Sequence, residues 1–438
     1  MLWSARSLNL GLCALALAIA LFIAIIDSRR LRVYIYDFKG SGHDAADELG
    51  DVTVVPRLTR RFRESEYAWP DGDTADYYFI PTRGHFDTQQ QLLAHLNVVR
   101  TKYPWFNRTR DAGQVRHYIF FPGDGGPGSV AFNNPTKCPD PEIPEDINPA
   151  CPGRALGMFL NLGMRTGADL NQSECVWCFQ AKKDIFIPIL SNVCAALCGW
   201  VARVAKSYVR GYVISQMQQL FADFVRPSLA PMQHPDATEY TGRGGIYAHY
   251  RNKPGYKIVR SGEDKPVPFA PFMRRTDWCY SPVGQSGGVP DRYHPAILHG
   301  CLPVMQQTIV HATPVPVVLP FEDILPWHLF STLVHVRHLD HLEKQLECLK
   351  PYVKRMRANL RGAWTYMMYS SIYGPFVGED GGNDAFEGII RVLTKRRDNN
   401  WTVDAETYSR ITEREKWFPC ILNSTATDLV GHMTWFAS

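Results

Sequence analysis

The sequence predicts an α/β fold with mostly parallel sheets, divided into two units behind an apolar amino-terminal segment. Short β-rich runs recur along the 438 residues, and helical patterns separate several of them. Strands that alternate with helices need crossover connections, and such connections produce parallel sheets. The length exceeds what one hydrophobic core usually holds. With 47 Lys and Arg against 43 Asp and Glu, the formal charge is only +4, so we expect no nucleic-acid partner.

The first element is an uncharged run from Leu8 to Ile26, which we expect to be a retained transmembrane anchor. The run is long enough to cross a hydrocarbon core of about 30 Å. The charged sequence IIDSRR ends it where a signal peptide would have a small-residue cleavage site. Arg29, Arg30 and Arg32 follow the run and only Arg6 precedes it, which by the positive-inside rule places the large remainder in the cytosol.

Two other observations favour a lumenal location for that remainder. Four sequons could accept glycans only in the lumen, at Asn107, Asn171, Asn400 and Asn423. Ten of the eleven cysteines follow the apolar run, as is common where disulfides persist. We therefore expect a lumenal domain.

Four of these cysteines also have the spacing of a zinc site. Cys175 and Cys178 form one close pair, Cys194 and Cys198 form another, and two such pairs can complete a tetrahedron. The strand-like DIFIPIL lies between the pairs, however, and CAALC is apolar rather than turn-forming. Disulfides or buried thiols are the favoured interpretation, with zinc as the alternative.

Alternating apolar and β-branched residues predict the strands, and an apolar face at helical spacing predicts a helix from Thr88 to Lys102. The predicted strands are Leu31 to Phe38, Asp76 to Pro81, His117 to Pro122, Asp184 to Leu190, Tyr256 to Val259 and Leu302 to Met305. One or two long helices are expected from His335 to Tyr369, with a buried face formed by Leu339, Leu342, Leu346 and Leu349.

A helix-forming stretch at 190–235 that ends in three prolines separates the two units. The expected organisation is a cytosolic tip and anchor at 1–30, a first domain with its helical linker at 31–235, a second domain at 236–395 and a tail at 396–438.

A glycine-rich loop, Gly123-x-Gly125-x-x-Gly128, follows the strand that begins at His117. It has the form of a dinucleotide fingerprint, but the proline-rich SVAFNNPTKCPDPEIP cannot form the helix that such a site requires. The loop nevertheless lies where α/β sheets place ligands. His117 or Asp124 could accept a proton from an attacking hydroxyl there, and a core histidine with a turn aspartate is the alternative.

Two patterns resemble metal sites, and we favour a structural interpretation of both. Asp71-Gly-Asp73 resembles a two-carboxylate manganese element, but WPDGDTAD is also a good turn. His335, His338 and His341 share three-residue spacing in a predicted helix, which is typical of a solvated face. No metal site is therefore predicted.

The segment from Arg274 to Val334 carries the strongest signal for ligand binding. A strand that ends at Ser281 precedes a Gly- and Ser-rich loop, which is followed by Asp291 and Arg292. A short helix ending at Gly300 and a buried strand, CLPVM, come next. Loop amides and a fixed guanidinium donate hydrogen bonds to a diphosphate, and a structural loop with a surface arginine is the alternative.

Ordered motifs in this segment, WCYSPVGQSGG…DR, HGCLPV and LPFEDILPW, resemble the exostosin family, glycosyltransferase family 47. Upstream, VYIYDF, TADYYFIP, HYIFFPGDGG and DIFIPI correspond more weakly. The resemblance implies a single-pass type II protein of the Golgi membrane. It also implies a GT-B arrangement of two Rossmann-like domains behind an N-terminal transmembrane helix, and transfer of a hexose or pentose from a nucleotide sugar to a glycan.

The resemblance also assigns roles to individual residues. It places Arg292 on the donor diphosphate, Ser286, Gly287 and Gly288 in the nucleotide loop, and Cys279 and Cys301 at structural positions. Asp124 corresponds to an acidic turn that faces the acceptor, and we expect it to be the base. Arg243 is expected to supply a second cation. No obligatory cofactor is expected, since arginines can neutralise the leaving diphosphate without a metal.

One departure from the family pattern concerns the donor site. The family commonly has an acidic residue six positions before Cys301, where this chain has Pro295. Either Asp291 or His294 takes over the role of that residue, or donor binding is weakened. The alternative function is therefore a catalytically silent, glycan-binding or scaffolding subunit of a transferase complex. Association with itself or with other glycosyltransferases is also expected.

Overall fold

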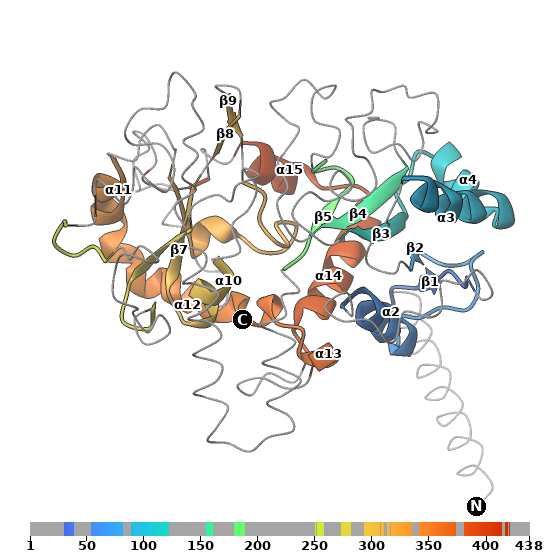
Figure 1. Cartoon of the computed structure of the whole chain (residues 1–438), viewed down its shortest axis with the longest axis horizontal. Helices are drawn as coiled ribbons and strands as arrows, with labels where there is room; N and C mark the ends of the chain where they lie inside the picture. Colours follow the sequence, from blue (N-terminus) through green and yellow to red (C-terminus); the bar gives the residue numbers. More distant parts are fainter. Residues whose placement is uncertain are drawn as a thin grey trace, which may run out of the picture.

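The computed structural model describes residues 30–38, 54–81, 89–121, 155–160, 179–188, 250, 252–257, 273–281, 293–306, 308–310, 313–315, 317–334, 341–373, 381–413, 417–418 and 420. They form two parallel sheets and a two-stranded hairpin, with helices packed around them (Figure 1). The predicted α/β class with parallel sheets is confirmed. The GT-B arrangement and the domain limits stay predictions.

The first sheet has five parallel strands in sequential order, β1-β2-β3-β4-β5. They are β1 (Val33–Ile35), β2 (Tyr77–Ile80), β3 (His117–Phe121), β4 (Leu156–Leu160) and β5 (Ile185–Phe186). Four of these lie within predicted runs, and β4 was not predicted. In the run predicted at 256–259, residues 256 and 257 are not in a strand, and the other two lie outside the described residues.

Aromatic side chains cover both faces of the first sheet. Helix α2 (Val54–Glu64) packs on one face, where Phe62 stacks on Phe79 with ring centroids 4.7 Å apart. On the other face Trp105 packs against Tyr34, with ring centroids 4.5 Å apart. Trp105 begins α4 (Trp105–Asp111), which follows α3 (Gln89–Lys102), the helix predicted from Thr88.

The second sheet has three parallel strands in the order β10-β7-β6. They are β6 (Trp278–Ser281), β7 (Leu302–Gln306) and β10 (Thr332–Val334). The short helix α10 (Tyr293–Leu298) precedes β7, and Gly300 takes a φ of 74° between them, which glycine adopts without strain. The predicted strand, helix and buried strand are therefore present. A hairpin of β8 (Thr308–Val310) and β9 (Thr313–Val315) follows.

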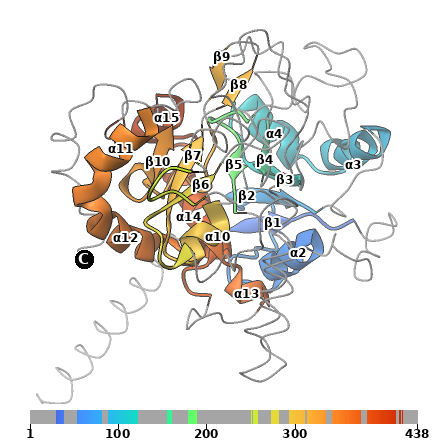
Figure 2. The ribbon, with the colours of Figure 1, turned by 60° about the vertical axis from the view of Figure 1, so that its left-hand side comes forward.

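Helices α11 (Leu342–Leu349) and α12 (Val353–Ala363) lie beside the second sheet (Figure 2). A 3-10 turn, η4 (Lys350–Tyr352), separates them because Pro351 lacks the amide hydrogen that a continuous helix needs. The expected helical segment is thus present in pieces, and Leu342 and Leu349 are buried as predicted. Two further short pieces follow, η5 (Thr365–Met367) and α13 (Ser370–Tyr373).

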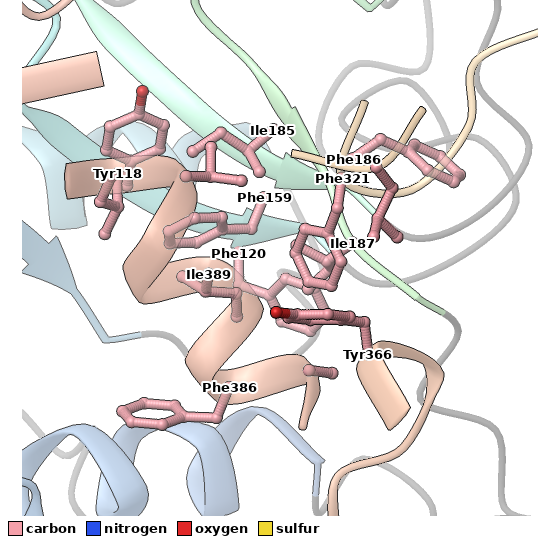
Figure 3. Close-up of a cluster of buried hydrophobic side chains, with 14 of the residues drawn as sticks. Tyr118, Phe120, Phe159, Ile185, Phe186, Ile187, Phe321, Tyr366, Phe386 and Ile389 are labelled. Atoms are coloured by element: carbon pink, nitrogen blue, oxygen red, sulfur yellow. The ribbon is translucent and has the colours of Figure 1, made fainter. Parts of the chain in front are cut away.

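The chain then returns to the first sheet through α14 (Ala385–Asp398), which precedes α15 (Ala405–Thr412). The N-cap of α14 is Asp384, whose carboxylate accepts a hydrogen bond from the amide of Glu387. Ile389 of this helix lies beside Phe120 of β3 and Phe159 of β4 (Figure 3), and Phe386 packs against Phe62 of α2 with ring centroids 5.0 Å apart. One continuous hydrophobic core therefore contains residues of both sheets.

The predicted anchor, Leu8 to Ile26, lies outside the described residues. Within the part of the chain that the structure describes, no helix combines the length and the apolar character needed to cross a membrane.

Candidate functional site

The candidate site lies at the carboxyl edge of the second sheet, where β6 and β7 end. Loops that leave the carboxyl ends of parallel strands are the usual ligand-binding positions of α/β folds. Strand β6 ends at Ser281 and β7 ends at Gln306, and both residues are fully buried. The segment that carries the predicted donor-binding motif begins directly after β6, and α10 follows it.

A disulfide joins the two strands at the opposite edge of the sheet. Cys279 of β6 and Cys301, directly before β7, are bonded with their Cα atoms 5.7 Å apart. The motif's two cysteines thus have the structural role that the family resemblance implies. A second disulfide joins Cys348 at the end of α11 to Cys420, and neither pairing was predicted. The zinc-like pairs Cys175/Cys178 and Cys194/Cys198 lie outside the described residues.

Most of the predicted ligand-binding residues also lie outside the described residues, and their roles stay predictions. These residues are the base Asp124 and the donor-binding residues Arg243, Ser286, Gly287, Gly288, Asp291 and Arg292.

Helix α10 begins directly after the predicted donor loop, and its first residues are buried. His294 is buried, with Nε2 2.7 Å from the carbonyl oxygen of Met367, so this nitrogen carries the proton and donates. Burial lowers the pKa of His294, which keeps the imidazole neutral. Pro295 is also buried. The side chain of His294 is therefore occupied by a hydrogen bond within the protein. Of the two residues suggested to replace the missing acidic residue, Asp291 is the better candidate.

The LPFEDILPW motif lies between the two sheets and contributes packing and hydrogen bonds. The amide of Phe321 donates to the carbonyl of Phe186 at the end of β5, at 2.8 Å. Trp327 Nε1 donates to the carbonyl of Pro320 at 2.7 Å. The carboxylate of Asp323 pairs with Arg396 of α14 at 2.7 Å. The Phe321 bond connects the motif to the first sheet, the Asp323 pair connects it to α14, and the Trp327 bond lies within the motif.

His117, the second candidate for proton transfer, is a buried residue at the amino end of β3. Its ring nitrogens lie 2.7 Å from the hydroxyl of Tyr36 and 3.2 Å from that of Thr109. The ring also stacks on Tyr78 with centroids 4.3 Å apart. Burial, with a smaller effect of Arg116, holds the pKa of His117 well below its ordinary value. These contacts favour the alternative of a core histidine.

The Asp71-Gly-Asp73 element forms a turn on the surface. The carboxylate of Asp71 accepts hydrogen bonds from the amide of Asp73 at 2.9 Å and the hydroxyl of Thr74 at 2.8 Å. The carboxylate of Asp73 accepts a hydrogen bond from Trp105 Nε1 at 3.1 Å, and its Oδ1 lies 3.0 Å from Nη2 of Arg108 in an ion pair. These bonds favour the turn interpretation.

The histidine triplet is described only in part. His341 precedes α11 and is exposed, and His335 and His338 lie outside the described residues. No group of three His, Cys, Asp or Glu side chains in the described part of the chain is placed to hold a metal ion.

The two sequons that the structure describes differ in accessibility. Asn107 lies within α4, is half-buried, and donates through Nδ2 to the carbonyl of Arg100 at 3.3 Å. Asn400 lies in the turn after α14 and is exposed. The other two, Asn171 and Asn423, lie outside the described residues.

Comparison with known proteins relates the chain to plant glycosyltransferases. No protein-family model matches it. The chain is 25% identical over 269 residues to a protein of Arabidopsis thaliana named Probable glycosyltransferase, covering 61% of the chain and 41% of the relative. A second Arabidopsis protein of that name is 22% identical over 356 residues, with coverage of 76% and 62%. A protein of Physcomitrium patens named Probable glucuronosyltransferase is 25% identical over 134 residues, with coverage of 30% and 27%.

The resemblance to the exostosin family is confirmed. The chain spans 41% and 62% of the length of the two Arabidopsis relatives. The described parts of the exostosin-like motifs lie on β6, at the start of β7 and in the segment before β10, so they form or border the second sheet.

Sequence reasoning missed two kinds of residue at this exostosin-like site. Arg396 of α14 pairs with the motif, but it lies in a helix that was not predicted. No role was predicted for Gln306 from the sequence. A glutamine directly after the apolar run CLPVM is a polar residue at the end of a predicted buried strand, and that position could have indicated a ligand-binding residue.

Proposed function

We propose that the chain is a glycosyltransferase that moves a sugar from a UDP-linked donor to a polysaccharide or a glycoprotein glycan, with inversion at the transferred carbon. The observation that carries this proposal is the similarity to plant glycosyltransferases over 61% of the chain. Two parallel sheets, with the exostosin-like motif at the carboxyl edge of the second, support the proposal.

Inverting transfer in one step requires two chemical contributions from the protein. A base takes the proton of the acceptor hydroxyl while the oxygen attacks the sugar carbon. We assign this role to Asp124. Cationic groups stabilise the negative charge that develops on the departing diphosphate. We assign that role to Arg292, with Arg243 as the second cation, so that transfer needs no obligatory metal.

We further propose that the protein acts in the Golgi lumen as a single-pass type II membrane protein anchored by Leu8 to Ile26. The two disulfides support an oxidising compartment, since disulfides persist there and are rare in the cytosol. Association with itself or with other glycosyltransferases is part of the same proposal.

The second candidate function is a catalytically silent, glycan-binding or scaffolding subunit of a transferase complex. Pro295 stands where exostosin relatives commonly have an acidic residue, and His294 beside it is held by the carbonyl of Met367. If no neighbouring group replaces the missing carboxylate, the chain would bind donor poorly.

Release of UDP by the full chain across a panel of UDP-sugars, with glycan acceptors, separates these functions. We expect turnover with at least one donor, and a loss of about a hundredfold or more in Arg292→Ala and in Asp124→Asn. Lys350→Ala, at an exposed site, is the matched control and should retain activity. Full turnover in Arg292→Ala would contradict the site assignment. No turnover and no binding of any nucleotide would favour the silent subunit.

A further inference from the structure

The carboxyl ends of β6 and β7 differ in character from those of the other described parallel strands. Ser281 and Gln306 are polar, and both are fully buried. The other parallel strands of the two described sheets end on apolar residues, which are Ile35, Ile80, Phe121, Leu160, Phe186 and Val334. Polar character is thus confined to two neighbouring strand ends on one edge of the second sheet.

One polar atom of each residue lacks a hydrogen-bond partner within the described structure. Gln306 Oε1 accepts a hydrogen bond from the hydroxyl of Tyr280 at 2.7 Å, and this bond fixes the orientation of the amide. Gln306 Nε2 and Ser281 Oγ are both buried and bond to no described group. A buried polar atom without a partner is costly and calls for an explanation, such as a ligand that supplies the missing acceptor.

Comparable residues beside the same sheet are fully engaged. Gln345 of α11 donates through Nε2 to the hydroxyl of Thr332 and to the carbonyl of Leu333, both at 2.7 Å. The hydroxyl of Ser331 donates to the carbonyl of Trp327 at 2.7 Å. The fold therefore satisfies a buried glutamine and a buried serine near the same sheet, whereas Gln306 and Ser281 each keep one unpaired atom.

The strand register places the two unpaired atoms on opposite faces of the sheet, near its carboxyl edge. Ser281 is paired with Met305, so Gln306, one residue further along, faces the opposite side of the sheet. Because the two side chains lie on opposite faces, a ligand that meets both must lie across the carboxyl edge of the sheet, where the two neighbouring strands are about 4.8 Å apart. A nucleotide has acceptor oxygens on its base, ribose and phosphates and is large enough to do so.

We propose that Gln306 Nε2 and Ser281 Oγ donate hydrogen bonds to the nucleotide of the sugar donor, and that Tyr280 is the positioning residue that orients the Gln306 amide. The inference rests on the proposed function and adds residues that the family motif does not assign.

The test compares matched substitutions in the full chain, using heat stability with and without UDP. Gln306→Met removes the unpaired donor and keeps the volume, so we expect unchanged or higher stability without UDP, and a dissociation constant for UDP raised about tenfold. Gln345→Met is the control, and it should lower the stability of the free protein while leaving the UDP dissociation constant unchanged.

The serines form a second matched pair. Ser281→Ala should weaken UDP binding without lowering the stability of the free protein, whereas Ser331→Ala should show the reverse. Tyr280→Phe should raise the UDP dissociation constant less than Gln306→Met does, because the amide loses its orientation but keeps its donor.

Three results would overturn the proposal in distinguishable ways. If the wild type binds UDP and both Gln306→Met and Ser281→Ala bind it equally well, the pair does not contact the nucleotide and the proposed function stands. If both variants lose stability and keep UDP binding, a buried water is the partner. If UDP, GDP and ADP all fail to bind the wild type, the proposed function fails together with this inference.

Discussion

Arg396 and Asp323 form a buried ion pair that connects the last long helix to the exostosin-like motif. Arg396 Nε lies 2.7 Å from Oδ1 of Asp323, and Nη2 lies 3.0 Å from Oδ2. The arginine also donates to the carbonyls of Lys183 and Asp184 beside β5. Although burial lowers the pKa of Arg396, the Asp323 carboxylate and the Tyr118 hydroxyl raise it above its ordinary value, so the guanidinium stays charged. One side chain thus connects α14, the motif and the first sheet.

Replacing Arg396 with Met should lower the free energy of unfolding by about 3–5 kcal/mol, because it leaves the Asp323 carboxylate buried without a counter-ion. Unfolding in urea measures this change. The double variant Arg396→Met with Asp323→Leu should recover part of the loss, since both charges are then absent.

The matched control for this prediction is Lys350→Met. Lys350 pairs with Glu347 at 3.3 Å, but the two side chains are 71% and 66% exposed. Its loss should change the free energy of unfolding by less than about 1 kcal/mol. An equally small effect of Arg396→Met would show that the buried pair does not stabilise α14 on the first sheet.

Gly388→Ala should destabilise the protein although alanine is the better helix former. An exposed glycine in a helix normally gains about 1 kcal/mol on replacement by alanine. In α14, however, a Cβ at residue 388 would lie 2.8 Å from Cε2 of Phe321 and 3.1 Å from Cδ1 of Tyr366. We expect a net loss of about 1–3 kcal/mol in urea unfolding. The loss should shrink in a background carrying Phe321→Leu, and a gain in stability from Gly388→Ala alone would contradict the close packing.

Acid should destabilise the protein between about pH 6.5 and pH 4 through two half-buried histidines, His299 and His328. Burial, with a smaller effect of Arg410, lowers the pKa of His328 to about 4, and burial with Arg274 does the same for His299. In this window the unfolded chain binds protons that the folded chain excludes, so stability is complete above pH 6.5 and falls as the pH approaches 4. His328→Gln should reduce the slope of unfolding free energy against pH by up to about 1.4 kcal/mol per unit. An unchanged slope would mean that His328 titrates alike in both states.

Glycosidase treatment of the protein from a eukaryotic secretory host should reveal a glycan at Asn400 and none at Asn107. Asn400 is exposed in a turn, whereas Asn107 is half-buried in α4 and uses its amide nitrogen to bind the carbonyl of Arg100. Asn400→Gln should therefore decrease the glycosylated mass, and Asn107→Gln should not. A protein with no glycan at any sequon would instead support the cytosolic orientation suggested by Arg29, Arg30 and Arg32.

Strands with continuous β-rich patterns were predictable, and elements that depend on distant contacts were not. The run HYIFF predicts β3 because it is apolar and aromatic. In LGMFL of β4, Gly157 weakens the strand pattern, yet the structure needs glycine there because a Cβ would lie 2.5 Å from the ring of Tyr118. Helix α14 contains four charged residues among its last five, and no local pattern shows that Arg396 would be buried.

The site shows the same division. The strand, helix and strand around the predicted donor loop follow from local signals. The family resemblance implies structural positions for Cys279 and Cys301, and the disulfide between them was not predicted. The burial of His117 and His294 could not be predicted, because their partners Tyr36 and Met367 lie 81 and 73 residues away in the sequence.

The return of α14 to the first sheet sets an order for folding during synthesis. Ile389 covers side chains of strands, and Phe386 packs on helix α2, all of which leave the ribosome more than 180 residues earlier. At a typical translation rate of about 5–20 residues per second, those strands wait on the order of ten seconds or more with one apolar face incomplete. During that interval the nascent chain exposes a surface that chaperones recognise, and release of a chain truncated before α14 would leave that surface permanently exposed.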